Sequence, residues 1–142
     1  MALIKATYPD LSGDVWAPRD CAEGGRSEHK EYRAIDWMID SSKRGQKAVA
    51  RAFLTWLLAT DSEGNEHAMA RRLGVMYIGW NNRIWESYTT PPGWSDIDNG
   101  GLPCSQTPDD VYDTAPCHRD HIHISLSWDG AAGTTSFWGG SP

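Results

Sequence analysis

The distribution of apolar positions predicts one central helix with strands on either side of it. Val49, Phe53, Trp56 and Leu57 recur at helical spacing within Gln46–Ala59, and they form one apolar stripe. The serines of "SSKRGQ" offer an N-terminal cap, and "TDSEGNE" supplies turn residues at the other end. We therefore expect an amphipathic helix here whose stripe, Trp56 included, faces a core.

Shorter apolar runs predict the neighbouring elements. Ala34–Ile39 suits a buried strand, and "VMYIGW", "NNR" and "IWESY" in succession are typical of a β-hairpin. A short helix is expected over Ala68–Leu73, ended by Gly74. The last strand is expected over His121–Trp128.

Two segments, 1–26 and 89–117, are rich in Gly, Pro and Asp and are predicted to be loops, with one short strand in the first. A loop as long as the second is usually functional or mobile in a compact domain. A helical middle flanked by strands predicts an α+β domain built on an antiparallel sheet. The 142 residues suffice for one domain with its own core, so we expect a single domain over 1–142.

The charge and hydropathy patterns exclude two classes of partner. Acids outnumber bases 19 to 13 and no basic block stands out, so we expect no nucleic-acid partner. No apolar run approaches the ~20 residues that span a bilayer. The start, "MALIKATYPD", lacks the apolar segment of a signal peptide, so either the chain is made without one or an export signal lies outside this sequence. We expect a monomer.

Three cysteines occur, at Cys21, Cys104 and Cys117, and no CxxC pair is present. A zinc site made of thiolates is therefore not expected. Cys104 and Cys117 bracket a loop and are the natural pair for a disulfide in an oxidising compartment. Three buried thiols fit the sequence equally well.

The histidines suggest a metal site. In "DHIHIS", His121 and His123 alternate along a predicted strand and therefore share one face. In "SEHKEYRAID", His29 precedes Asp36 by seven residues. Two imidazoles and a carboxylate, with a fourth position left for water, are typical of catalytic zinc sites. Histidines at this spacing are more often ordinary hydrogen-bonded side chains, so the residues alone leave both interpretations open.

The quoted segments also resemble a known family. "SEHKEYRAIDW" with "HRDHIHISLSW" resembles the zinc peptidases of the D-alanyl-D-alanine carboxypeptidase group, which shares a fold with lysostaphin-type endopeptidases and the hedgehog signalling domain. The group's pattern is met at Ser27, His29, Asp36, His121 and His123. "FLTWLLATDSEGNEHAMARRLGVMYIGWNNRIW" and "TSFW" resemble a branch common in actinobacteria and their phages. The resemblance spans most of 19–138 and implies a small antiparallel sheet with helices packed on one side.

The resemblance implies a role for each residue of the metal site. His29, Asp36 and His123 would bind Zn²⁺, which lowers the pKa of a water molecule from 15.7 to roughly 7. His121 would lie beside the metal and hydrogen-bond to the water or to the developing oxyanion. The alternative is that His121 is a fourth ligand, which would close the site and make it structural.

Asp120 matches the acid that this group places three residues before its last histidine ligand, and so it is the expected general base. Residues three apart on a regular strand face opposite sides. Asp120 must therefore lie in a turn or bulge before the strand begins. The alternative is a surface acid paired with Arg119.

Three further residues are expected to contact substrate. Ser27 matches the motif serine, which lies in the substrate site of related dipeptidases, although it could simply cap the loop. Arg19 matches an arginine of the branch, and a guanidinium binds the carboxylates of stem peptides in a bidentate manner. Tyr32 stands where the group usually has glycine, a residue that can indicate positive φ or close backbone approach. The tyrosine puts the local loop geometry in doubt, and we also expect it to line the substrate cleft.

The implied function is hydrolysis of amide bonds in peptidoglycan stem peptides. An L-Ala–D-Glu endopeptidase is preferred over a D-Ala-D-Ala carboxypeptidase, because basic residues are scarce in 89–117. A phage endolysin or its catalytic domain, released to the cell wall by a holin, fits the chain; so does a secreted actinobacterial enzyme. The alternative from another class is a non-catalytic, zinc-bearing module that binds the cell wall.

Overall fold

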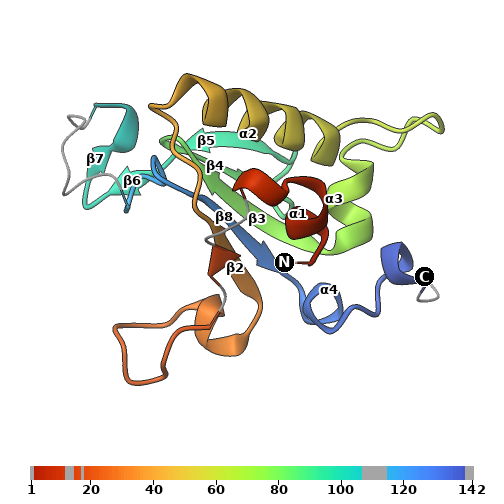
Figure 1. Cartoon of the computed structure of the whole chain (residues 1–142), viewed down its shortest axis with the longest axis horizontal. Helices are drawn as coiled ribbons and strands as arrows, with labels where there is room; N and C mark the ends of the chain where they lie inside the picture. The colour runs from red at the N-terminus through yellow and green to blue at the C-terminus, as the bar shows by residue number, and fades with distance from the viewer. Residues whose placement is uncertain (1, 12–14, 17, 107–114, 140–142) are drawn as a thin grey trace.

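A six-stranded antiparallel sheet forms the centre of the computed structural model, which describes residues 2–11, 15–16, 18–106 and 115–139 (Figure 1). The strand order is β1-β2-β8-β3-β4-β5. The strands are β1 (Val15–Trp16), β2 (Ala34–Trp37), β3 (Val75–Trp80), β4 (Arg83–Glu86), β5 (Gly93–Asp96) and β8 (Ile122–Leu126). A second, two-stranded sheet pairs β6 (Asp98–Asn99) with β7 (Leu102–Pro103). The α+β prediction is therefore confirmed.

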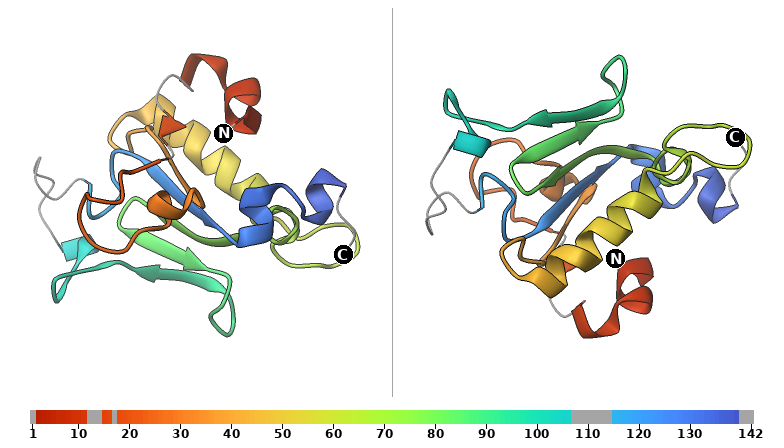
Figure 2. Two further views of the ribbon diagram at one scale, coloured as in Figure 1. Left: turned by 90° about the horizontal axis from the view of Figure 1, so that it is seen from below. Right: turned by 90° about the horizontal axis from the view of Figure 1, so that it is seen from above.

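The helices are short apart from one. They are α1 (Ala2–Thr7), α2 (Arg44–Leu57), α3 (Ala68–Leu73) and α4 (Trp128–Ala132), with 3₁₀ turns η1 (Pro9–Leu11), η2 (Glu28–Glu31), η3 (Cys104–Gln106) and η4 (Ser136–Trp138). Helices α1 and α2 lie on one face of the sheet, and the loop that carries η2 lies on the other side (Figure 2). Among the described residues, no helix has the length and apolar character needed to cross a membrane.

The side chains of β8 point alternately to the two faces of the sheet. Ile122 and Ile124 are buried in the core cluster, together with Phe53 and Leu57 of α2. Because side chains alternate along a strand, His123 and Ser125 point to the opposite face. The last strand of the sheet lies between β2 and β3, so it brings C-terminal histidines beside residues from the N-terminal third of the chain.

Helix α2 confirms the amphipathic prediction, but the position of Trp56 and the N-terminal cap differ from it. It packs through Ala50, Phe53, Leu54 and Leu57, which follow i, i+3, i+4, i+7 spacing. Trp56 lies outside this stripe and is 42 % exposed, so its expected core position was wrong.

The serine cap expected for α2 was also wrong. Lys43 is the N-cap and makes no side-chain capping bond. Asp40 Oδ1 accepts from both the backbone N–H and the hydroxyl of Ser42, at 2.8 and 2.7 Å. The local Asp–Ser turn therefore directs the Ser42 hydroxyl to Asp40 instead of to the N–H groups of the helix.

The β3–β4 hairpin and the end of α3 agree with the sequence. Asn81 and Asn82 have φ values of 48° and 74°, as a two-residue type I′ turn requires. Gly74 ends α3 with φ 73°. The backbone N–H groups of Asn81 and Asn82 donate to the carbonyls of His118 and Cys117, so the turn also holds the segment that leads into β8.

Three sequence predictions need correction. Residues 1–26 contain helix α1, whose one buried side chain, Ile4, gives too little periodicity to detect. The predicted loop 89–117 contains β5, a four-residue edge strand that pairs with β4. The last strand ends at Leu126, because Ser127 caps α4 by accepting the N–H of Gly130. Residues 107–114 of that loop lie outside the described residues.

The structure decides between the two states of the cysteines that the sequence leaves open. Cys104 and Cys117 form a disulfide and are fully buried, while Cys21 is exposed as a free thiol. The bridge joins η3 to the segment that precedes β8.

Candidate metal centre

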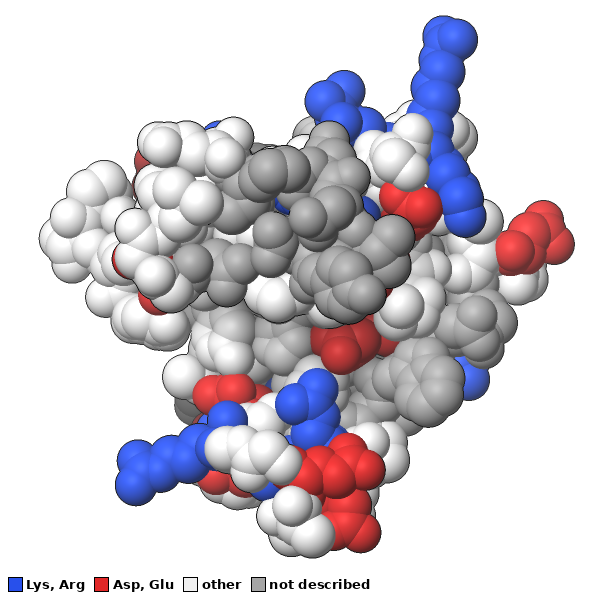
Figure 3. All heavy atoms as spheres, turned by 90° about the vertical axis from the view of Figure 1, so that its left-hand side faces the viewer, with Lys and Arg blue, Asp and Glu red and all other residues white. Residues whose placement is uncertain are grey.

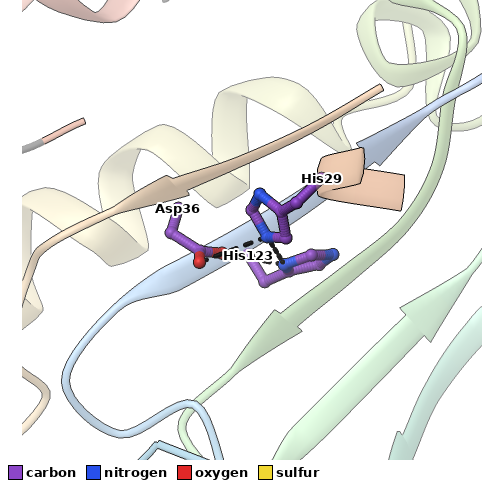
Figure 4. A group of neighbouring side chains, drawn as sticks. All are labelled: His29, Asp36 and His123. Carbon is purple, nitrogen blue, oxygen red and sulfur yellow. Dashed lines mark hydrogen bonds and ion pairs between the residues drawn. The ribbon is translucent and has the colours of Figure 1, made fainter. Parts of the chain in front are cut away.

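Three side chains from three elements converge on one point of the open face of the sheet. His29 comes from η2, Asp36 from β2 and His123 from β8, and they point toward one another (Figure 4). Asp36 and His123 are cross-strand neighbours in the β2–β8 register. Of the described residues, these three form a group whose ligand atoms all lie within 4.8 Å of one another.

The position of His29 is set by the local structure of the η2 turn. Ser27 is its N-cap, and the hydroxyl of Ser27 accepts the backbone N–H of His29. Tyr32 ends the turn with φ 57°, and its N–H donates to the carbonyl of His29. This left-handed conformation explains a glycine preference at the position, and the tyrosine adopts it nonetheless. The side chain of Tyr32 is 75 % exposed and is not among the residues that line the cleft described below.

The two imidazole nitrogens and the two oxygens of the Asp36 carboxylate lie at distances close to those around a tetrahedral metal. His29 Nε2 lies 3.2 Å from His123 Nδ1 and 3.2 Å from Asp36 Oδ2, and His123 Nδ1 lies 2.8 Å from Asp36 Oδ1. Ligand atoms at 2.0–2.1 Å from a tetrahedral zinc lie about 3.3 Å from one another. Two nitrogens and one carboxylate also make a donor set that zinc accepts readily. His29, Asp36 and His123 therefore fit the ion that the sequence predicts.

The charge of Asp36 suits a cation. Burial on its own raises the pKa of this carboxyl, but hydrogen bonds from His123 and His29 outweigh burial and hold the pKa well below its usual range. Asp36 is therefore ionised at neutral pH. It places a full negative charge against two imidazoles that are almost completely buried.

A cleft of about 950 Å³ opens onto the three ligands. Its lining includes seven of the eight residues to which the sequence assigns a role: Arg19, Ser27, His29, Asp36, Asp120, His121 and His123. The cleft therefore brings together residues that lie as far apart as 19 and 123 in the sequence.

Acidic and basic side chains are interspersed on the face of the molecule drawn in Figure 3, and among the described residues neither sign of charge covers that face.

Asp120 lies where the sequence required it, before the first residue of β8, Ile122. Its Oδ1 is 2.8 Å from Nδ1 of His121, and its side chain is 36 % exposed at the cleft. His121 Nε2 lies 3.7 Å from Asp36 Oδ1. Arg119 is buried and donates to Asn82 Oδ1 and to the carbonyl of Cys104. Asp120 and His121 therefore form a hydrogen-bonded pair beside the ligand group.

His118 is a further residue of the cleft wall. Its ring lies 4.9 Å from that of His121 and 5.5 Å from that of His123. Gly79 gives it room, because a Cβ on that glycine would lie 2.7 Å from the ring. Burial, together with the two neighbouring imidazoles, lowers the pKa of His118 to about 4, so it is neutral at physiological pH.

Sequence reasoning missed Tyr77, which packs against His123, and Glu28, which is hydrogen-bonded to Tyr77. The Tyr77 ring stacks on the His123 ring, with centroids 5.3 Å apart and an interplanar angle of 18°. The hydroxyl of Tyr77 donates to Glu28 Oε2 at 2.8 Å. The alternation of β3 places Tyr77 opposite the core residue Ile78, but its partner on β8 depends on a register that the sequence does not reveal.

Comparison with known proteins identifies a family. The family described as "VldE, C-terminal domain" matches residues 1–107, and the chain belongs to it. The matched region contains His29 and Asp36 and ends before His123. No curated protein and no solved structure matched the chain.

Proposed function

We propose that this member of the VldE C-terminal domain family is a zinc peptidase that hydrolyses amide bonds in peptidoglycan stem peptides. One observation carries the proposal: His29, Asp36 and His123 present two imidazole nitrogens and a carboxylate, 2.8–3.2 Å from one another, in the lining of an open cleft. The sequence resemblance to the D-alanyl-D-alanine carboxypeptidase group supplies the substrate class. It also supports a fold related to that of the hedgehog signalling domain.

Zinc in such a site activates water at neutral pH and polarises a carbonyl. The chain's own residues then handle the proton. Asp120 acts as the general base and passes the proton to the leaving amine, because its carboxylate faces the cleft and lies outside the ligand group. His121 lies between the carboxylates of Asp120 and Asp36, and it steadies the developing oxyanion.

The loop before η2 supplies the residues that bind the substrate. Arg19 and Ser27 line the cleft, and the Arg19 guanidinium is suited to a carboxylate of the stem peptide. Segment 89–117 contains no lysine or arginine, so it offers no cation to grip a C-terminal carboxylate. This supports an L-Ala–D-Glu endopeptidase over a carboxypeptidase. Such an enzyme acts on the cell wall, either as an endolysin released by a holin or as a secreted protein.

The test combines metal analysis with product analysis. Purified protein loaded with zinc is expected to hold one ion per chain by elemental mass spectrometry and to release peptides with new amino groups from peptidoglycan. Mass spectrometry of the digest identifies the bond: free D-alanine indicates the carboxypeptidase, and a product with a new N-terminal D-Glu indicates the endopeptidase.

Two variants separate metal binding from catalysis. Asp120→Asn is expected to keep zinc and to lose about 10²–10⁴-fold in hydrolysis, the usual share of a general base. His123→Ala is expected to lose both zinc and hydrolysis. Asp129→Asn, an exposed acid on α4, is the matched control with unchanged activity. Zinc-loaded protein that binds cell walls but never releases an amino group would be a binding module, and the peptidase proposal would fail.

A further inference from the structure

One wall of the cleft is a loop that contributes no side chain to the core. We call residues 18–26, which precede η2, the wall loop. Every residue of the wall loop is exposed. Its members in the cleft lining are Pro18, Arg19, Asp20, Glu23 and Arg26. Because no buried side chain anchors the wall loop, its position beside the metal centre depends on hydrogen bonds to the rest of the chain.

Lys30 supplies most of these hydrogen bonds. Its Nζ donates to the carbonyl of Cys21 at 2.9 Å and to the carbonyl of Gly24 at 3.0 Å. The backbone N–H of Arg19 donates to the carbonyl of His29 at 3.4 Å. Within the described part of the chain, these three bonds are the ones that join the wall loop to other residues. The two bonds from the ammonium are shorter and charge-assisted, so Lys30 forms the stronger connection.

We propose that Lys30 is a positioning residue, which holds the wall loop against η2 and thereby fixes Arg19 at the cleft to bind a carboxylate of the substrate. Lys30 is not among the residues that line the cleft, so it acts on the substrate only through the wall loop. This inference rests on the proposed function. It deepens that function because it assigns the placement of the substrate-binding loop to one side chain.

The same short turn determines the position of a metal ligand and of the wall loop. His29 and Lys30 are consecutive residues of η2. The His29 side chain points toward Asp36 and His123 (Figure 4), whereas the Lys30 ammonium reaches the wall loop. The separation between the metal centre and Arg19 is therefore fixed by local structure. That separation determines which amide bond of a peptide held by its carboxylate reaches the metal centre.

A different role for Lys30 would be to neutralise the acids beside it in η2, Glu28 and Glu31. Both acids have other partners, since Glu28 Oε2 accepts from the Tyr77 hydroxyl at 2.8 Å and Glu31 is paired with Arg33. Among the described residues, Lys30 forms no ion pair with either acid. The partners of its ammonium are the two carbonyls of the wall loop, which supports the positioning role.

Lys30→Met tests the proposal, because it removes the ammonium and keeps an apolar side chain of similar length. Without the two hydrogen bonds, substrate binding must order the wall loop, which weakens binding. The KM for a soluble stem peptide is expected to rise about tenfold, the worth of one hydrogen bond from a charged group, while kcat and zinc content stay unchanged. Lys47→Met is the matched control, since Lys47 is also half-buried and lies on α2, outside the cleft lining. A wild-type KM in Lys30→Met would overturn the proposal.

A double-mutant cycle tests whether Lys30 acts through Arg19. Arg19→Gln removes the guanidinium that the wall loop presents. In that background, Lys30→Met is expected to raise KM much less than tenfold, because the group that it positions is already absent. Effects that simply multiply would show that Lys30 does not act through Arg19, and the proposal would fail.

Limited proteolysis of the zinc-loaded proteins gives a readout that does not depend on activity. Trypsin can cut after Arg19 and Arg26, which both lie in the exposed wall loop. Mass spectrometry is expected to show cleavage at these two sites about tenfold faster in Lys30→Met and unchanged in Lys47→Met, because the rate follows the population of the open loop. Cleavage after Arg51 on α2 is the internal reference, since unfolding of the whole domain would accelerate it equally. Equal rates at Arg19 and Arg26 in Lys30→Met and the wild type would contradict the proposal.

The outcomes distinguish this proposal from the proposed function. If the wild type hydrolyses stem peptides and Lys30→Met matches it in KM and in trypsin cleavage, the role of Lys30 fails and the peptidase proposal stands. If the wild type hydrolyses no peptidoglycan, the peptidase proposal fails and the substrate role of Lys30 fails with it. The trypsin rates then still show whether Lys30 holds the wall loop.

Discussion

The buried disulfide should contribute a measurable share of the stability of this domain. Cys104 and Cys117 are 13 residues apart in sequence. Closing a loop of this length in the unfolded chain is worth about 3 kcal/mol by the chain-entropy relation. The perturbation is reduction with a phosphine, in a Cys21→Ser background that removes the exposed thiol and so prevents disulfide exchange.

Urea denaturation of the metal-free protein provides the assay. The free energy of unfolding is expected to fall by about 3 kcal/mol on reduction. The control is Cys104→Ala/Cys117→Ala, whose stability must not respond to the reductant. Zinc affinity should be unchanged on reduction, because all three ligands lie outside the closed loop. Oxidised and reduced proteins of equal stability would refute the reasoning, since the bridge would then constrain nothing in the unfolded state.

Three smaller changes test the surroundings of the site. Gly79→Ala forces His118 to move, and urea titration should show a loss of about 1–3 kcal/mol; Gly45→Ala, with open space in α2, is the control and should gain up to about 1 kcal/mol. The pKa of His118 is about 4 against an ordinary 6.5, so the unfolded chain binds more protons between these values. Metal-free protein should therefore lose up to about 3 kcal/mol as pH falls through this window, and His118→Phe should abolish that slope in urea titrations at neutral and acidic pH. Tyr32→Gly should gain about 0.5–1 kcal/mol by relieving the left-handed backbone, whereas Tyr32→Ala should not, as thermal unfolding would show.

Local patterns predicted the elements whose signal is local. Helix α2 and the β3–β4 hairpin follow from spacing and from the Asn81–Asn82 turn, which needs no distant partner. Helix α1 and strand β5 were missed because each is held by other parts of the fold. Ile4 is the one buried residue of α1, and β5 is a four-residue edge strand defined by its pairing with β4.

The restriction to local patterns also explains which parts of the site the sequence predicted and which it did not. His29, Asp36 and His123 stand in motifs, and a resemblance was enough to join them. Tyr77 stands in no motif, and its contact with His123 depends on the β3–β8 register, which shifts at an irregularity between Val75 and Tyr77. A sequence pattern gives the face of a strand but not the residue that lies opposite it on a distant strand.

We expect the sheet that carries the site to form without the metal. Strands β2 and β8 pair directly, and the core behind them buries Trp37, Ile122 and Ile124 against α2. Small zinc domains unfold without their metal because little else holds them together. Here a chelator is expected to leave near-UV circular dichroism intact and to lower the stability only by linkage, about 2.7 kcal/mol when free zinc had been at 100 times its Kd. Asp36→Asn, which keeps the shape but not the charge, should lose that zinc-dependent increment while remaining folded. Collapse of the near-UV signal on chelation would show that zinc holds the sheet together, and the cleft would then be a structural site.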